Sequence, residues 1–281
     1  MRCSKLYGER GFTLVELLIA MALALVIIAS LSRAFVIQQK TFNTQEQMAE
    51  MTQNSRAAID IMTREIRMAG YGTPTSNLSS WIDWVSGVAF GTEPIVIEDG
   101  AGALGSDIIH IAACFDKPSA RLNSVASAGD TSITLKTGEG SKFNTTAKKL
   151  IMIGQLENAV ITGISGDTLT IDTDPVTSGN QGLKSTHASG EEVCILKVIT
   201  YSIVQDRADS YVLKRDENVG AGRQPVAENI MDMQITMTNN TVEINPLTAR
   251  TEKSDPEYTQ NNGYRTYDQR AFITPPNLLI Q

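Results

Sequence analysis

One carboxylate stands alone inside an apolar segment near the N-terminus. Residues 12–31 are 20 consecutive positions with a single charge, Glu16. About 20 apolar residues can span a bilayer, and a carboxylate within such a span costs roughly 2.5–3.5 kcal/mol at its centre and less toward its end. No Lys, Arg or His lies between Phe12 and Ser32. The cation at that depth is then an amino terminus, formed at Phe12 or carried by a neighbouring chain; the alternative is a carboxylate lying idle at the headgroup level.

Two cysteines could form a covalent cross-link. Cys3 lies within the first 11 residues, and the other two, Cys114 and Cys194, lie in runs typical of β-strands. In an exported domain they would meet an oxidising compartment, where disulfides form and persist. The alternative is two small apolar side chains buried on core strands. The spacing in the sequence does not show whether the two Cα atoms lie within the ~4.4–6.8 Å that a disulfide requires, so both interpretations stay open.

No pattern predicts a metal ion, a cofactor or catalysis. Three Cys and two His are too few for a zinc or iron–sulfur site, and no acidic loop has calcium-binding spacing. Residues 100–105 satisfy G-x-G-x-x-G, but a strand-like run follows where a dinucleotide site needs a helix. His110 and His187 lie in no nucleophile motif, so we expect structural roles for both. The chain is therefore expected not to be an enzyme.

The element that must position Glu16 is a long helix. All nine prolines lie at or after Pro74, and no glycine occurs between Gly11 and Gly70, which leaves 58 residues without a helix breaker. At ~1.5 Å per residue such a helix would be about 87 Å long, far beyond the usual helix of a compact domain. We expect a transmembrane half at residues 12–32 and an amphipathic stalk half at residues 33–70.

The stalk half carries one apolar stripe. Its members recur at steps of three and four, which places them on a single helix face: Met51, Ser55, Ala58, Met62, Ile66 and Ala69, with Met48 and Ile59 beside them. The opposite face carries charged and amide side chains, including Asp60 and Arg64. The stripe is expected to pack against a following domain, and the opposite face is expected to remain exposed to solvent.

After Gly70 the sequence changes to short β-branched runs separated by Gly, Asn, Asp and Ser. This pattern predicts a β-rich domain at residues 71–281, with residues 119–190 as an inserted β-module. Gly166-Asp167 predicts a tight hairpin. Residues 192–204 are expected to form one strand, and residues 241–245 another that ends before a polar loop at residues 246–263. The predicted fold class is α+β.

Charge limits the classes of partner. The chain has 24 Lys and Arg against 31 Asp and Glu, a net charge of -7, which disfavours a general nucleic-acid binder. Before the apolar run, three cations (Arg2, Lys5, Arg10) face one anion, Glu9, a bias that retains this end in the cytoplasm. Without residues 1–11 the chain would carry 21 cations against 30 anions, so the part expected to cross outward is acidic.

Residues 10–16, RGFTLVE, followed by the apolar run, resemble the cleavage and methylation motif of type IV prepilins and of type II secretion pseudopilins. The resemblance implies removal of a leader, residues 1–11, by cleavage between Gly11 and Phe12, and methylation of the new amino terminus on Phe12. A glycine before the cut suits a peptidase at the bilayer face because it gives a slender, extended backbone. The resemblance also implies that Glu16 pairs with the amino-terminal amine of the adjacent subunit and sets axial register during assembly.

Residues 54–71, NSRAAIDIMTREIRMAGY, resemble the helix end of PilW-type minor pilins and are similar to the J-type pseudopilins of type II secretion. A pilin-like fold follows from this resemblance: a long N-terminal helix and then a β-rich globular domain. Major pilins resemble each other in having a Pro or Gly midway through the buried helix, and this chain has neither in residues 12–69. That difference favours a minor, low-copy subunit.

The expected function is structural: a minor pilin that helps to initiate or cap a type IV pilus. The partners implied are a prepilin peptidase and methyltransferase, other minor and major pilins, and an inner-membrane assembly platform, with no nucleic acid and no cofactor. The protein would cross the inner membrane once, with its C-terminal domain in the periplasm, and then join a pilus at the cell surface. The alternatives are a type II secretion minor pseudopilin and a membrane-tethered periplasmic ligand-binding protein or adhesin.

Overall fold

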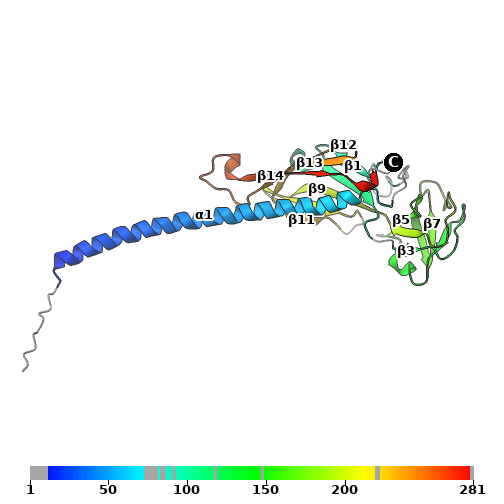
Figure 1. Ribbon diagram of the computed structural model, residues 1–281, viewed down its shortest axis with the longest axis horizontal. Coiled ribbons are helices and arrows are strands. Elements are labelled where there is room, and N and C mark those ends of the chain that lie inside the picture. The colour runs from blue at the N-terminus through cyan, green and yellow to red at the C-terminus, as the bar shows by residue number, and fades with distance from the viewer. Residues whose placement is uncertain are drawn as a thin grey trace, which may run out of the picture. The chain divides into compact units, whose positions relative to one another are not determined.

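The computed structural model describes residues 12–72, 82, 87–88, 90, 93–116, 119–146, 149–218 and 222–278. It consists of one long helix followed by a β-rich domain of several antiparallel sheets, which confirms the predicted α+β, pilin-like fold class (Figure 1). The chain divides into two compact units, Met1–Ala49 and Glu50–Gln281. This boundary lies inside the segment predicted as the stalk, because the stripe that begins at Met51 is part of the core of the second unit.

The helix α1 runs without a break from Leu14 to Met68, 55 residues. It ends where two glycines adopt the left-handed conformation, Gly70 at φ +76° and Gly72 at φ +73°, which residues with a side chain rarely adopt. The Gly70 N–H then donates to the Ala112 carbonyl oxygen at 3.1 Å, and the Cys114 N–H donates to the Tyr71 carbonyl oxygen at 2.9 Å. These bonds join the end of the helix to a strand of the first sheet.

The predicted stripe of α1 is buried as expected. Met51, Ser55, Ala58, Ile59, Met62, Ile66 and Ala69 are all buried. Met48, expected beside the stripe, is 43% exposed, so the buried part of the helix begins later than predicted. The Ser55 hydroxyl, the one polar group of the stripe, donates to Gln269 Oε1 at 2.8 Å.

Two antiparallel sheets build the main core around this stripe. The five-stranded sheet has the order β1-β2-β9-β10-β11, and the three-stranded sheet has the order β12-β13-β14. Their strands are β1 Ile95–Glu98, β2 Ile108–Ala113, β9 Lys197–Arg207, β10 Ser210–Asp216, β11 Gln224–Glu228, β12 Ile230–Thr238, β13 Thr241–Arg250 and β14 Thr266–Ile273. Alternate residues of β2 and β9 face the helix, among them Ile111, Ile199 and Tyr201.

The strand β13 differs from the prediction, which ended it before Pro246. It continues to Arg250, and the register shifts between Ile244 and Leu247, so that Pro246 lies in a bulge. Proline has no backbone N–H, and at a bulge the ladder skips positions, so the strand loses no hydrogen bond there. Residues 247–249 therefore pair with both β12 and β14, and the loop expected at residues 246–263 begins only after Arg250.

The remaining strands form a separate six-stranded sheet in the order β3-β8-β5-β6-β7-β4. They are β3 Ala120–Arg121, β4 Ser132–Thr134, β5 Leu150–Ile153, β6 Glu157–Ser165, β7 Thr168–Asp172 and β8 Glu192–Ile195. A bridge between Leu122 and Leu135 joins its two end strands, so the sheet closes on itself as a small barrel. The barrel has its own apolar core, including Leu135, Ile151 and Leu169.

The barrel corresponds to the module expected at residues 119–190, although its last strand, β8, extends to Ile195. The predicted hairpin at Gly166-Asp167 is confirmed between β6 and β7. The single strand expected at residues 192–204 is wrong: Leu196 separates β8, which belongs to the barrel, from β9, which belongs to the five-stranded sheet. Short 3-10 turns complete the described elements: η1 Ala103–Gly105, η2 Gly140–Lys142, η3 Asn261–Gly263 and η4 Pro276–Leu278.

Candidate functional site

The N-terminal end of α1 is organised by two side chains, Thr13 and Glu16. The Glu16 N–H donates to Thr13 Oγ1 at 3.2 Å, and the Thr13 N–H donates to Glu16 Oε2 at 3.1 Å. The Thr13 hydroxyl also donates to the same carboxylate oxygen at 3.0 Å. This reciprocal arrangement is a capping box, in which Thr13 and Glu16 satisfy amide groups that have no partner within the helix. Glu16 is thus held over the first turn of the helix.

The surface around this cap is apolar on every side. The large apolar side chains of residues 12–37 are more than half exposed, from Phe12 at 87% to Val36 at 52%. A helix that is apolar all round is buried in a protein core or in a membrane, and in this chain the described residues do not cover it. α1 is long and apolar enough to cross a membrane by length and composition. The structure and the sequence together therefore indicate a membrane-anchoring helix with a carboxylate near one end.

The exposed apolar surface continues past the length that one crossing needs. The predicted transmembrane half ends at residue 32, and beyond it Phe35, Val36, Ile37 and Phe42 are exposed. Phe35 and Phe42 are seven positions apart and so lie on one face of the helix. A single tether would end its apolar surface at the headgroups, so this extension needs another explanation.

Of the residues predicted for cleavage and methylation, Gly11 and the leader, residues 1–11, lie outside the described residues. Phe12 precedes the N-cap Thr13 and is the most exposed of the large apolar residues described.

Residues 7–32 match the family described as the prokaryotic N-terminal methylation motif. The chain is type IV prepilin-like. The match covers the positions predicted for cleavage, methylation and assembly: Gly11, Phe12 and Glu16. Such a motif implies processing by a prepilin peptidase and assembly with pilins in the membrane. No curated protein matches the chain, and no solved structure matches it.

The two cysteines of the prepilin-like chain are joined in the structure. A disulfide links Cys114, directly after β2, to Cys194 in β8, with their Cα atoms 5.9 Å apart and 80 residues of separation. The bond is buried beside Met152 and Tyr71. A Cβ atom on Gly72 would lie 2.8 Å from Cys114 Sγ, so this glycine is required by close approach as well as by its φ. The disulfide connects the five-stranded sheet to the barrel at the end of α1.

The buried part of α1 is anchored by a polar contact that was not predicted from the sequence. Glu65 accepts from Arg215 Nε at 2.9 Å and from the Tyr201 hydroxyl, and Arg215 also donates to Glu217 at 2.9 Å. Burial, and then the charge of Glu65, raise the pKa of Tyr201, so its hydroxyl remains a donor at any physiological pH. Glu65 lies beside the stripe, and its partners are 136 and 150 residues away, so no local signal identifies them.

The cap residue Thr13 was also missed, although a signal exists. Residues 13–16, TLVE, satisfy the Ser/Thr-x-x-Glu pattern of a capping box immediately before a long apolar run. That pattern predicts a helix that starts at Leu14, two residues after the predicted cleavage point.

Proposed function

We propose that this chain is a minor pilin, an assembly subunit and not an enzyme, which helps to initiate or cap a type IV pilus. One observation carries the proposal: a methylation motif is fused without a break to a helix whose exposed apolar surface extends from Phe12 to Phe42. The first part of that surface suits the bilayer. The remainder suits the apolar helices of neighbouring subunits, which a simple tether would not need.

Before assembly, the proposed protein crosses the inner membrane once. The cations of residues 1–11 hold that end in the cytoplasm, and the β-rich domain lies in the periplasm. Cleavage between Gly11 and Phe12 then creates an amine at Phe12, which is methylated. The periplasm is an oxidising compartment, which agrees with a disulfide between Cys114 and Cys194.

In the proposed filament, Glu16 has two tasks. Within its own chain it completes the capping box with Thr13 through Oε2. Between chains, its carboxylate receives the amine of the adjacent subunit, since residues 12–32 provide no other cation. In an apolar surrounding an unpaired carboxylate is costly, so the pair forms at the one axial offset that brings the two groups together. Glu16 would thereby set register.

The first test is the amino-terminal peptide of the native protein from its own host, measured by mass spectrometry. A peptide that begins at methylated Phe12 supports a processed pilin-class subunit. An intact Met1 end overturns the proposal in favour of a tethered periplasmic ligand-binding protein or adhesin. Partners that co-purify then separate a pilus from a type II secretion pseudopilus: major pilins support the proposal, whereas secretion components contradict it.

The second test separates the two tasks of Glu16. Glu16→Ala removes both the cap and the amine partner and is expected to abolish incorporation into filaments. Thr13→Ala removes the cap hydroxyl alone and is expected to assemble. Glu46→Ala, an exposed carboxylate on the same helix, is the matched control. Normal assembly of Glu16→Ala, or equal loss with Thr13→Ala, would show that the carboxylate does not act between subunits.

A further inference from the structure

The face of α1 that points away from the core of the β-rich domain carries charges without partners. Four exposed charged residues recur along it at steps of four and three: Arg56, Asp60, Arg64 and Arg67. At about 100° per residue, their mean direction lies about 160° from that of the buried stripe. None of the four makes an ion pair or a side-chain hydrogen bond with another residue that the structure describes.

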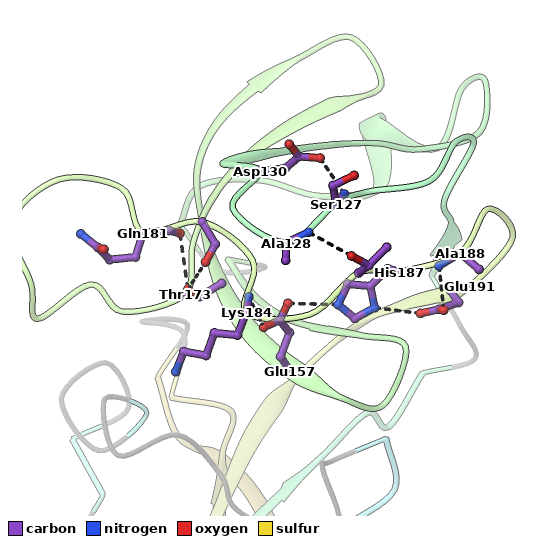
Figure 2. A network of polar contacts seen from close by, with 12 residues as sticks. Ser127, Ala128, Asp130, Glu157, Thr173, Gln181, Lys184, His187, Ala188 and Glu191 are labelled. Carbon is purple, nitrogen blue, oxygen red and sulfur yellow. Dashed lines mark hydrogen bonds and ion pairs between the residues drawn. The ribbon is translucent and has the colours of Figure 1, made fainter.

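Arginines in the rest of the β-rich domain are paired within the chain. Each arginine from Arg121 to Arg270 contacts a carboxylate or an aromatic ring. The buried histidine of the barrel is paired as well: His187 Nε2 lies 3.0 Å from Glu157 Oε1, and Nδ1 lies 2.8 Å from Glu191 Oε2 (Figure 2). In a chain with a net charge of -7, a helix face with three unpaired arginines is therefore an exception.

One of the three arginines has a local role. Arg67 lies in the last turn of α1, where a cation stabilises the negative end of the helix dipole. Arg56 and Arg64 lie further inside the helix. Asp60 is four residues from each, a spacing at which opposite charges on a helix can pair, yet its carboxylate contacts neither guanidinium in the described part of the chain. The feature to explain is an alternation of positive, negative and positive charge at intervals of four residues.

This alternation is complementary to itself after a shift. Two parallel copies of the segment in register would place like charges side by side. When one copy is displaced along the axis by four residues, about 6 Å, its Asp60 lies level with the partner's Arg56, and its Arg64 lies level with the partner's Asp60. A displacement of eight residues instead brings Arg64 level with the partner's Arg56, and these two charges repel. The charges therefore favour a displacement of four residues.

We propose that this face binds a second copy of the chain, as a parallel helix displaced by four residues. The inference rests on the proposed function, in which both copies cross one membrane in the same direction, so that their helices are parallel. The same displacement brings Glu16 level with the partner's amine, because Glu16 follows Phe12 by four residues. Two charge contacts near opposite ends of α1 then specify a single axial offset.

The charges select the offset, and the apolar surface of α1 supplies most of the affinity. Ion pairs between exposed side chains are weak in water and are screened by salt, so they do not hold two subunits together alone. Like charges that meet at other displacements make those displacements less favourable, which gives specificity. As a consequence, a low-copy subunit would enter the filament as an adjacent pair.

Disulfide cross-linking measures the offset. Gln53 and Ala57 are exposed and four residues apart, so the proposed pair places Ala57 level with the partner's Gln53. Two full-length chains with different tags, Gln53→Cys and Ala57→Cys, are expressed together in a host strain without the native copy and treated with a mild oxidant. We expect a mixed dimer that contains both tags, because a disulfide requires Cα atoms within ~4.4–6.8 Å.

Each cysteine variant expressed alone is the matched control. Its cysteines would be displaced by about 6 Å along the axis in addition to the separation between the helices, so it should give several-fold less dimer. Equal amounts of dimer from the single variants and from the mixture would overturn the offset. No dimer in any sample, or a cross-link only to a different protein, would overturn binding of a second copy.

Charge reversal in the cross-linking pair tests the cause. Asp60→Arg in both chains makes both contacts repulsive and should abolish the mixed dimer. Combining it with Arg56→Asp and Arg64→Asp restores complementarity with the signs exchanged, so the dimer should return. Arg67→Gln removes a charge outside the proposed contacts and should leave the dimer unchanged. An undiminished dimer in Asp60→Arg, or no recovery in the triple variant, would show that these charges do not set the contact.

The amino-terminal peptide of the same samples separates this inference from the proposed function. Methylated Phe12 without a mixed dimer would overturn the second-copy contact and leave the proposed pilin-class subunit in place. An intact Met1 end without a mixed dimer would overturn both.

Discussion

The two parts of α1 belong to one continuous helix but use apolar residues in opposite ways. The first part runs from Leu14 to Ala49, and almost all of its residues are exposed. The first half of this part is apolar on every side of the helix. From Glu50 to Met68 it has a single apolar stripe, and that stripe is buried in the core of the same chain. The first part leaves its apolar surface exposed, as a membrane-anchoring helix does. The second part fixes the helix to the β-rich domain.

The difference shows that helix propensity does not distinguish the two roles. Both parts lack Gly and Pro, and both remain helical. The two parts differ in the width of the apolar surface. A single stripe can be buried against one partner, whereas a helix that is apolar on every side has to be buried in a membrane or among several partners. Substitutions that remove the buried contacts of the second part should change folding, whereas substitutions of the apolar surface or of Glu16 in the first part should change assembly.

The largest effect is expected where the second part has its polar anchor. Glu65→Ala leaves Arg215 without its helix partner and the buried Tyr201 hydroxyl without an acceptor. Loss of one member of a largely buried pair costs about 3 kcal/mol or more. Urea unfolding of the full chain in detergent measures this loss. Asp60→Ala, at an exposed position of the same helix, is the control and should change the free energy of unfolding by no more than about 0.5 kcal/mol. Equal values for both variants would show that Glu65 does not anchor the helix.

The direct comparison of the two parts uses Met62 and Leu23. Met62 is fully buried in the main core, and Met62→Ala should lower the free energy of unfolding by about 2 to 4 kcal/mol. Leu23 is 60% exposed, and Leu23→Ala should leave the unfolding of the β-rich domain unchanged. Thermal unfolding followed by near-UV circular dichroism reports both. A comparable loss from Leu23→Ala would mean that the first part also contributes to the folded core.

The smallest effect is expected at the start of the first part. Thr13→Ala removes the cap hydroxyl and should destabilise the first turn by about 1 kcal/mol. That change corresponds to about fivefold faster amide exchange at Leu17, whose N–H donates to the Thr13 carbonyl oxygen. Thr44→Ala, inside the same helix, removes only a hydroxyl bonded to the Lys40 carbonyl oxygen and should leave that rate unchanged. An unchanged amide exchange rate at Leu17 in Thr13→Ala would contradict the capping box.

The sequence predicted what depends on local periodicity. The stripe from Met51 to Ala69 follows from steps of three and four, and the Gly166-Asp167 hairpin follows from adjacent turn residues. Contacts between distant segments could not be predicted in this way. The bulge that admits Pro246 arises from pairing with β12 and β14 at once, and the break at Leu196 arises because two sheets compete for neighbouring residues.

The same limit applies to the sites. Glu16 could be identified from the sequence because it is the single charge in an apolar run. Recognising it does not depend on knowing which distant residues of the chain contact it. His187 gave no such signal: Glu191 is four residues away, but Glu157 comes from another strand, 30 residues earlier. The disulfide remained open from sequence because strand-like runs 80 residues apart do not reveal whether their ends meet.

The position of the disulfide also has a mechanical consequence. Cys114 lies where the chain leaves β2 toward the barrel, and Cys194 lies just before it returns to β9. A pulling force applied to the chain before Cys114 and after Cys194 passes through the sulfur–sulfur bond, and the residues between them carry no tension. The barrel could then unfold, open or be cut while the five-stranded sheet and α1 stay covalently continuous. A subunit of a fibre that bears load would keep its strength independent of the module it carries.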